Sequence, residues 1–176
     1  MYVSDLFRRG RTVFSVEVFP PKRNGSIQTI YRTIENLQEL APDFISVTYG
    51  AGGNLADDTT CRIASAIKHR YGIEPLAHLT CVNSTCTEIE TVLTRLRDAG
   101  IENVLALRGD RIPDRSTAND YQYAYQLVEK IRAFGGFHIS AACYPEGHCE
   151  CASLAQDIVH LRRKVDAGAQ HLISQL

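Results

Sequence analysis

Polar residues follow each of six short apolar segments at nearly regular intervals. These residues are Glu17, Thr48, His78, Arg108 with Asp110, Tyr144 and Gln175. Successive members are about 30 to 36 residues apart, which is the length of one strand, one helix and their connections. In a β/α barrel the C-terminal ends of the strands meet at one mouth. We therefore expect these side chains to share one active site.

Glu17 is the candidate acid of this site. Strand alternation places Ser15, Glu17 and Phe19 on one face and Val16 and Val18 on the other. Loss of water around a carboxyl group raises its pKa, which suits it to general-acid work near neutral pH. The alternative is a strand-edge carboxylate paired with an arginine.

Asp110 and His78 are the next candidates. Asp110 follows Arg108 and Gly109 in a tight turn, where glycine allows the backbone to approach a ligand. Its alternative is an ordinary turn aspartate. His78 stands in an apolar strand, where it is either a hydrogen-bonded structural histidine or a catalytic one. Thr48 and Tyr144 are binding residues or solvated loop residues.

The elements that must position these residues alternate along the chain. Short apolar segments are separated by longer segments in which apolar residues recur with helical spacing, which indicates an α/β fold. No G-x-G-x-x-G opens a helix after the first strand, and this weakens the doubly wound alternative. The expected strands are 13–19, 44–48, 75–79, 104–107, 138–142 and 171–174.

Helix boundaries are also visible. Ser26 and Asp57 are candidate N-caps, and Thr87 with Glu90 forms a capping-box pattern. The tripeptide Asp-Ala-Gly ends the expected helices at 98–100 and 166–168.

Composition limits the kinds of partner. The net charge is −1 and no basic stripe is present, so we expect neither a nucleic-acid nor an anionic-membrane partner. The first residues lack the apolar segment of a signal peptide, so we expect a cytoplasmic protein. Its length predicts a single domain, 1–176. The six cysteines are then expected to be reduced thiols.

Two local patterns suggest other chemistry. The segment 143–151 contains Cys143, His148, Cys149 and Cys151, but Cys-x-Cys lacks the usual gap of a zinc site and no second ligand pair follows, so no metal is expected. The basic pair Arg163 and Lys164 is either a solvated helix face or a diphosphate clamp. Lysines are missing from the strand ends, which disfavours a Schiff-base aldolase.

Five segments carry a resemblance to the catalytic domain of the methylenetetrahydrofolate reductases. They are Ser15–Pro21, Ser46–Gly53, Leu107–Asp110, Tyr144–His148 and Arg162–Ala169, and they follow one another in order over the whole chain. The resemblance implies a TIM-type (β/α)8 barrel that holds FAD. It also implies a two-stage reaction, in which NADH or NADPH reduces the flavin and the reduced flavin then converts methylenetetrahydrofolate to methyltetrahydrofolate for methionine synthesis.

The same resemblance implies roles for individual residues. Glu17 aligns with the general acid that helps to open the folate ring, and Asp110 with the carboxylate near flavin and folate. Gln175 falls on a position that touches folate and nicotinamide, and Thr48 also lies near the nicotinamide. The FAD-contacting positions are Thr48, Tyr49, Ala51, His78, Arg108, Gly109, Asp110, Ala124, Tyr144, His148, Cys151, Asp157, His160, Arg163 and Lys164.

Some residues depart from the family pattern. His160 replaces an asparagine of related bacterial enzymes, and Cys149 and Cys151 replace proline and alanine, which implies an altered adenosine side of the FAD site. The match also implies a barrel truncated after its sixth strand, with six of eight β/α units and without the folate-binding residues of the rest.

Three functions follow as alternatives. The first is the reductase, which could form a homo-oligomer. The second is an inactive or flavin-binding-only fragment of such an enzyme. The third is a metal-dependent barrel hydrolase in which Glu17, His78 and Asp110 are the ligands. NADH and NADPH remain alternatives as the reductant, because no ribose-reading motif is visible.

Overall fold

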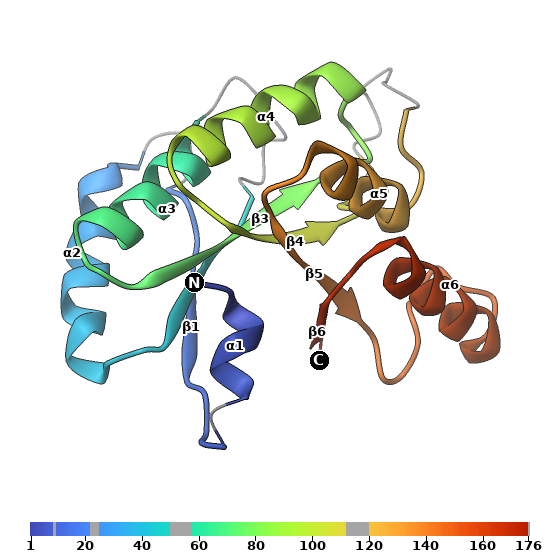
Figure 1. Cartoon of the computed structure of the whole chain (residues 1–176), viewed down its shortest axis with the longest axis horizontal. Coiled ribbons are helices and arrows are strands. Elements are labelled where there is room, and N and C mark those ends of the chain that lie inside the picture. The colour runs from blue at the N-terminus through green and yellow to red at the C-terminus, as the bar shows by residue number, and fades with distance from the viewer. Residues whose placement is uncertain (9, 22–24, 50–57, 112–119, 176) are drawn as a thin grey trace.

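The protein is built around six parallel strands that lie side by side in chain order. The computed structural model describes residues 1–8, 10–21, 25–49, 58–111 and 120–175. The strands are β1 (Ser15–Val18), β2 (Phe44–Val47), β3 (Glu74–Thr80), β4 (Asn103–Leu107), β5 (His138–Cys143) and β6 (His171–Ser174). Each pairs in parallel with the next, and the sheet curls into a half-barrel (Figure 1). All six expected strands are confirmed, with small shifts at their ends.

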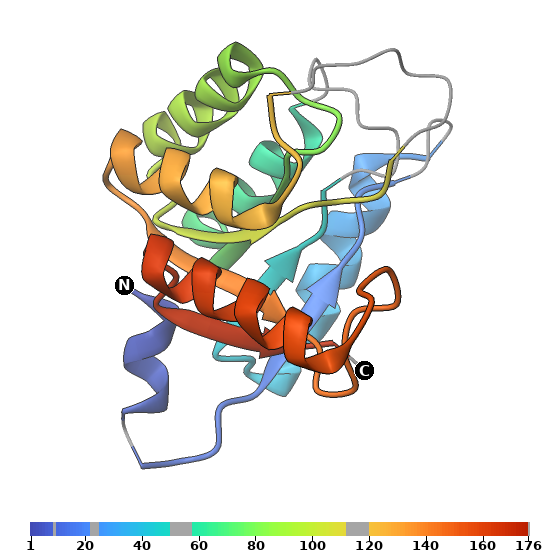
Figure 2. The same cartoon turned by 90° about the vertical axis from the view of Figure 1, so that its right-hand side faces the viewer.

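Helices connect the strands around the outer side of the sheet (Figures 1 and 2). They are α2 (Ile27–Leu37), extended by a 3₁₀ turn (Gln38–Leu40), then α3 (Thr59–His69), α4 (Cys86–Asp98), α5 (Ala124–Phe134) and α6 (Leu154–Ala167). In the described part of the chain none of these helices is long and apolar enough to cross a bilayer.

The helix caps confirm one prediction and correct another. Ser26 caps α2, because its hydroxyl accepts a hydrogen bond from Gln28 N. The predicted capping box at Thr87 is wrong: the structure forms it between Thr85 and Glu88, so the helix begins earlier. Both pairs match the same sequence pattern, but Thr85 has the extended backbone that a cap requires. The predicted cap Asp57 lies outside the described residues.

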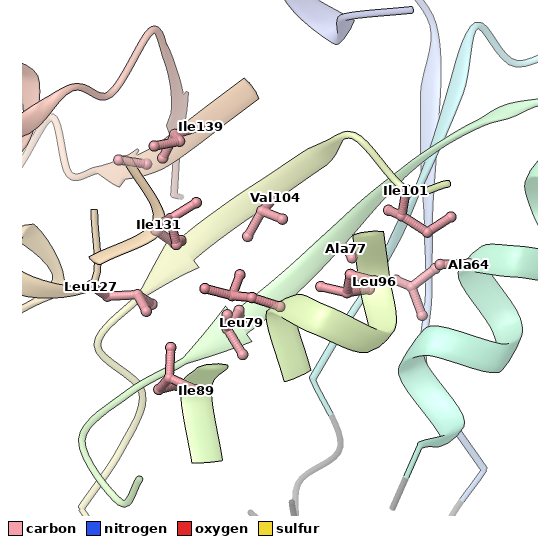
Figure 3. Close-up of a cluster of buried hydrophobic side chains, with 14 of the residues drawn as sticks. Ala64, Ala77, Leu79, Ile89, Leu96, Ile101, Val104, Leu127, Ile131 and Ile139 are labelled. Atoms are coloured by element: carbon pink, nitrogen blue, oxygen red, sulfur yellow. The ribbon is translucent and has the colours of Figure 1, made fainter. Parts of the chain in front are cut away.

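Strand alternation divides the apolar residues into two layers. One set, including Val16, Val47 and Leu79, packs with the helices in the main core, part of which is drawn in Figure 3. The opposite set faces the inside of the curved sheet. Its buried members Phe44, Leu76 and Leu105 form a second cluster with Val3 and Leu6 of helix α1 (Val3–Phe7), which the sequence patterns did not predict.

The two outer strands are less covered than the central ones. Residues of β2 are all buried, whereas those of β1 and β6 alternate between half-buried and exposed, apart from Val18. The apolar residues Leu154, Ile158, Val159 and Val165 of α6 are exposed as well. The best-packed part of the molecule is therefore the centre of the sheet, where most of the candidate side chains are attached.

Candidate active site

A cavity of about 830 Å³ lies where the C-terminal ends of the strands meet. Pockets of this size hold cofactors and small ligands in other proteins. The candidate residues that line it are Glu17, Thr48, Tyr49, His78, Arg108, Gly109, Asp110, Ala124, Tyr144, His148, Cys151, Asp157, His160, Lys164 and Gln175. The structure thus brings together residues that the sequence separates by more than a hundred positions.

Two candidates do not fit this description. Ala51 lies outside the described residues. Arg163 is not among the residues that line the cavity; its guanidinium lies 6.0 Å from the ring centre of Tyr125, which does line it. The two basic residues expected as a pair therefore have different surroundings, and only Lys164 faces the cavity.

Glu17 and His78 face each other on the inner side of the sheet. The distance from His78 Nε2 to Glu17 Oε2 is 3.5 Å, and their geometry forms no hydrogen bond. Burial lowers the pKa of His78 to about 4, so this imidazole is neutral at pH 7. Burial also raises the pKa of Glu17. Among the residues that the structure describes, no arginine forms an ion pair with Glu17, so the arginine-paired alternative finds no support there.

Two interpretations are open for His78, a hydrogen-bonded structural histidine and a catalytic one. Its side chain is 8% exposed, and its Nε2 atom has no hydrogen-bond partner among the described residues. A buried polar atom without a partner costs free energy, so this one needs an explanation beyond packing. A ligand in the cavity would supply the missing partner.

The turn Arg108-Gly109-Asp110 directly follows β4, lies beside the end of β3 and lines the cavity. Gly109 has a φ of +78°, and a Cβ atom on it would come within 2.9 Å of the Thr80 Cβ. Asn83 Nδ2 donates a 2.7 Å hydrogen bond to the Asp110 carbonyl oxygen. The turn is therefore tightly held, and only glycine fits its centre.

The connection after β5 and the helix α6 form the opposite wall. The Tyr144 ring meets the His148 ring edge-on at 4.8 Å, and His148 N donates to Asp157 Oδ2 at 3.0 Å. Lys164 Nζ donates to the Ala142 carbonyl at 2.8 Å. Burial lowers the pKa of Lys164, and the same loss of water would strengthen the attraction of its charged form to an anionic ligand.

Aromatic rings line one end of the cavity. Tyr123 stacks on Tyr125 with ring centres 5.9 Å apart and on His160 at 5.5 Å. His160 Nδ1 is buried and has no hydrogen-bond partner among the described residues. Flat rings beside an unpaired polar atom are suited to a flat heteroaromatic group.

Several lining residues escaped the sequence analysis. They are mainly Thr80, Asn83, Tyr123, Tyr125 and Glu150. The analysis searched the residue directly after each strand, whereas most of these lie deeper in the connections. The start of α5, with three tyrosines close together at 121, 123 and 125, was a signal that could have been used.

The donor set fits a nucleotide cofactor better than a metal. Within the described ranges, no group of three or more His, Cys, Asp or Glu side chains is arranged to hold a metal ion. Cationic Arg108 and Lys164, the aromatic stack and the unpaired imidazole nitrogens instead match the phosphates and rings of a flavin dinucleotide. The residues present thus fit FAD.

Known proteins resemble this chain over almost its whole length. A family model described as methylenetetrahydrofolate reductase matches residues 2–176. The 5,10-methylenetetrahydrofolate reductase of Escherichia coli (strain K12) is 40% identical over 167 residues, which cover 95% of this chain and 55% of that protein. The Arabidopsis thaliana protein named methylenetetrahydrofolate reductase (NADH) 1 is 36% identical, covering 99% of this chain and 32% of its own. This chain therefore spans about half the length of its bacterial relatives.

Among solved structures, the phosphoenolpyruvate phosphomutase from Streptomyces platensis subsp. rosaceus superposes with a TM-score of 0.64 at 15% identity. The match covers 98% of this chain and 62% of that one. At this identity the likeness concerns the fold alone.

Proposed function

This chain belongs to the methylenetetrahydrofolate reductase family. We propose that its cavity holds FAD and that the protein reduces 5,10-methylenetetrahydrofolate to 5-methyltetrahydrofolate with NAD(P)H. One observation carries the proposal: an acid, a neutral buried histidine and two cations, which come from four different segments of the chain, line a single cavity. As part of the same proposal, the half-barrel corresponds to six of the eight β/α units of a single TIM-type barrel domain.

FAD would be held mainly by the second half of the chain. Arg108 and Lys164 supply positive charge for the diphosphate, and Tyr144, His148 and Asp157 form the wall beside it. The chemistry that FAD would supply there is hydride transfer, from NAD(P)H in one stage and to the folate in a second, separate stage. The tightly held turn has no side chain at Gly109, which would let the backbone approach the cofactor closely.

Glu17 would hold the proton that opens the folate ring. Its raised pKa keeps more of the carboxyl group protonated near neutral pH than an exposed glutamate would be. The neutral imidazole of His78 adds no competing charge at 3.5 Å. Asp110, on the next wall of the cavity, would favour positive charge that develops on the folate.

Thr48 and Gln175 would complete the mouth. Thr48 O accepts a hydrogen bond from Thr60 Oγ1, and Gln175 N donates to the Cys143 carbonyl, so both backbones are anchored. Their side chains line the same cavity as Glu17. We assign them to the nicotinamide and folate, which bind in turn.

Rapid mixing without oxygen tests the proposal in two stages. The FAD-loaded chain is mixed with NADH or NADPH, and loss of the oxidised flavin absorbance reports the first stage. Methylenetetrahydrofolate is then added, and return of the absorbance reports the second. A reductase completes both stages, a flavin-binding-only protein completes neither or only the first, and a metal-dependent hydrolase binds no flavin.

A further inference from the structure

Arg108 is held on two sides by groups of the protein. Its Nη1 and Nη2 atoms donate to Glu150 Oε2 and Oε1 at 2.6 and 2.8 Å, and its Nε atom donates to the Gly109 carbonyl at 3.2 Å. This is a two-pronged fork, the strongest geometry available to an arginine and a carboxylate. Each Nη atom carries a second N–H that the fork does not use.

Glu150 is brought to Arg108 by a connection that is itself anchored. Glu150 N donates to His148 Nδ1 at 3.1 Å, and His148 N donates to Asp157 Oδ2 on α6 at 3.0 Å. Cys151 N donates to the His148 carbonyl at 2.8 Å. The carboxylate therefore has a fixed place at the cavity wall, although its side chain is 59% exposed.

Arg108 and Glu150 differ in burial, and this difference limits how much their ion pair can stabilise the fold. Arg108 is 20% exposed and Glu150 largely exposed, so the pair contributes little to the stability of the fold. A long arginine side chain otherwise samples many rotamers, and fixing it before a ligand arrives lowers the entropy cost of binding.

We propose that Glu150 is a positioning residue: its fork with Arg108 fixes the guanidinium so that the remaining N–H groups are ready for the cofactor. The inference rests on the proposed function, because it takes FAD as the occupant of the cavity. Glu150 itself need not touch FAD. Its effect on binding passes through Arg108.

A double-mutant cycle on the full chain tests this, with FAD affinity measured by the quenching of flavin fluorescence. Glu150→Ala should raise the Kd for FAD about tenfold, the scale of one charge-assisted hydrogen bond. Glu150→Gln, which can still accept one hydrogen bond from Arg108, should restore part of the affinity. Glu146→Ala, an exposed glutamate of the same connection, is the control and should leave the Kd unchanged.

The decisive comparison uses Arg108→Ala. If Glu150 acts through Arg108, Glu150→Ala has no further effect in that background, and the bound flavin spectrum of Glu150→Ala shifts toward that of Arg108→Ala. Independent, additive losses would overturn the proposal, as would unchanged or tighter binding by Glu150→Ala. If the wild-type chain binds no FAD at all, the proposed function itself fails, and the two failures are thereby distinguished.

Discussion

Glu17 and His78 show how burial can divide two roles between neighbouring side chains. Both lie on the inner face of the sheet, where loss of water disfavours whichever form is charged. The acid therefore keeps its proton to higher pH and the imidazole loses its proton at lower pH. At neutral pH the imidazole is therefore neutral, and more of the Glu17 carboxyl group is protonated than in a fully exposed glutamate.

Glu17→Gln should abolish most of the second stage and spare the first. Removing a general acid costs about 10²- to 10⁴-fold in rate. Flavin reduction by NAD(P)H needs no proton from Glu17, so its rate should stay close to that of the wild type. The rapid-mixing experiment that follows the flavin absorbance measures the rates of both stages.

The control for this variant is Glu129→Gln, an exposed glutamate on α5. The pH dependence adds a second check. In the wild type the second-stage rate falls as pH rises through the raised pKa of Glu17, because the acid form disappears. A Gln variant with the same rate and the same pH profile would contradict the role of Glu17.

Gly109→Ala should destabilise the fold and weaken FAD binding. An alanine at φ +78° costs about 1–2 kcal/mol in any position, and here its Cβ would also collide with Thr80. Gly136→Ala is the matched control, because Gly136 has a φ of +83° with no atom within 4 Å of a new Cβ. Urea unfolding of both variants separates the two costs. Equal losses would mean that the close contact with Thr80 has no effect.

At the scale of elements, helix α1 covers part of the inner face of the sheet. It lies toward the N-terminal ends of the strands, whereas the cavity lies at their C-terminal ends. Val3 and Leu6 pack onto Phe44, Leu76 and Leu105. Val3 N donates to the buried Asn103 side chain at 2.9 Å. A helix of five residues is unstable alone, so this packing must hold it.

Leu6→Ala should lower the free energy of unfolding by about 2–4 kcal/mol, because it leaves a cavity among buried side chains. Phe7→Ala, one position further along the same helix, should cost less, since Phe7 is 50% exposed, although its ring also contacts that of His171. Far-UV circular dichroism during urea unfolding measures both. A larger loss in Phe7→Ala would show that α1 packs differently.

The sequence predicted the elements that repeat and missed those that do not. Six strands and the helices between them were found because apolar spacing and Asp-Ala-Gly stops recur. Helix α1 was missed because one turn is too short to show a period. The capping box was placed at Thr87 because Thr85 and Thr87 fit the same pattern, and only the backbone decides between them.

The candidate site was predictable to a similar extent. Residues directly after strands are fixed by topology, so Glu17, His78 and Arg108 could be nominated from spacing. Glu150 could not, because its place depends on how the connection after β5 is anchored to His148 and Asp157. Hydrogen bonds within a connection of this kind produce no periodic pattern in the sequence.

At the scale of the whole molecule, buried histidines make the fold sensitive to acid. Burial lowers the pKa of His78, His138 and His171, so the unfolded chain binds more protons than the folded one as pH falls below about 6.5. Stability should therefore fall between pH 7 and pH 4. His78 alone accounts for about 2 kcal/mol of that loss by pH 5.

Urea unfolding at several pH values checks this prediction. His78→Gln should make the free energy of unfolding less dependent on pH between 7 and 5, whatever it does to the absolute value. The control is His69→Gln, because His69 is an exposed histidine at the end of helix α3. A stability that is flat over this range in the wild type would show that the three histidines are not buried in solution.

The central claim is that the cavity at the strand ends is a flavin site, and an FAD titration of the purified chain tests it most directly. The account predicts one saturable site, weakened in Lys164→Met and unchanged in Lys130→Met, whose lysine pairs with Glu90 outside the cavity. Absence of saturable binding, or equal affinity in Lys164→Met and the wild type, would contradict it.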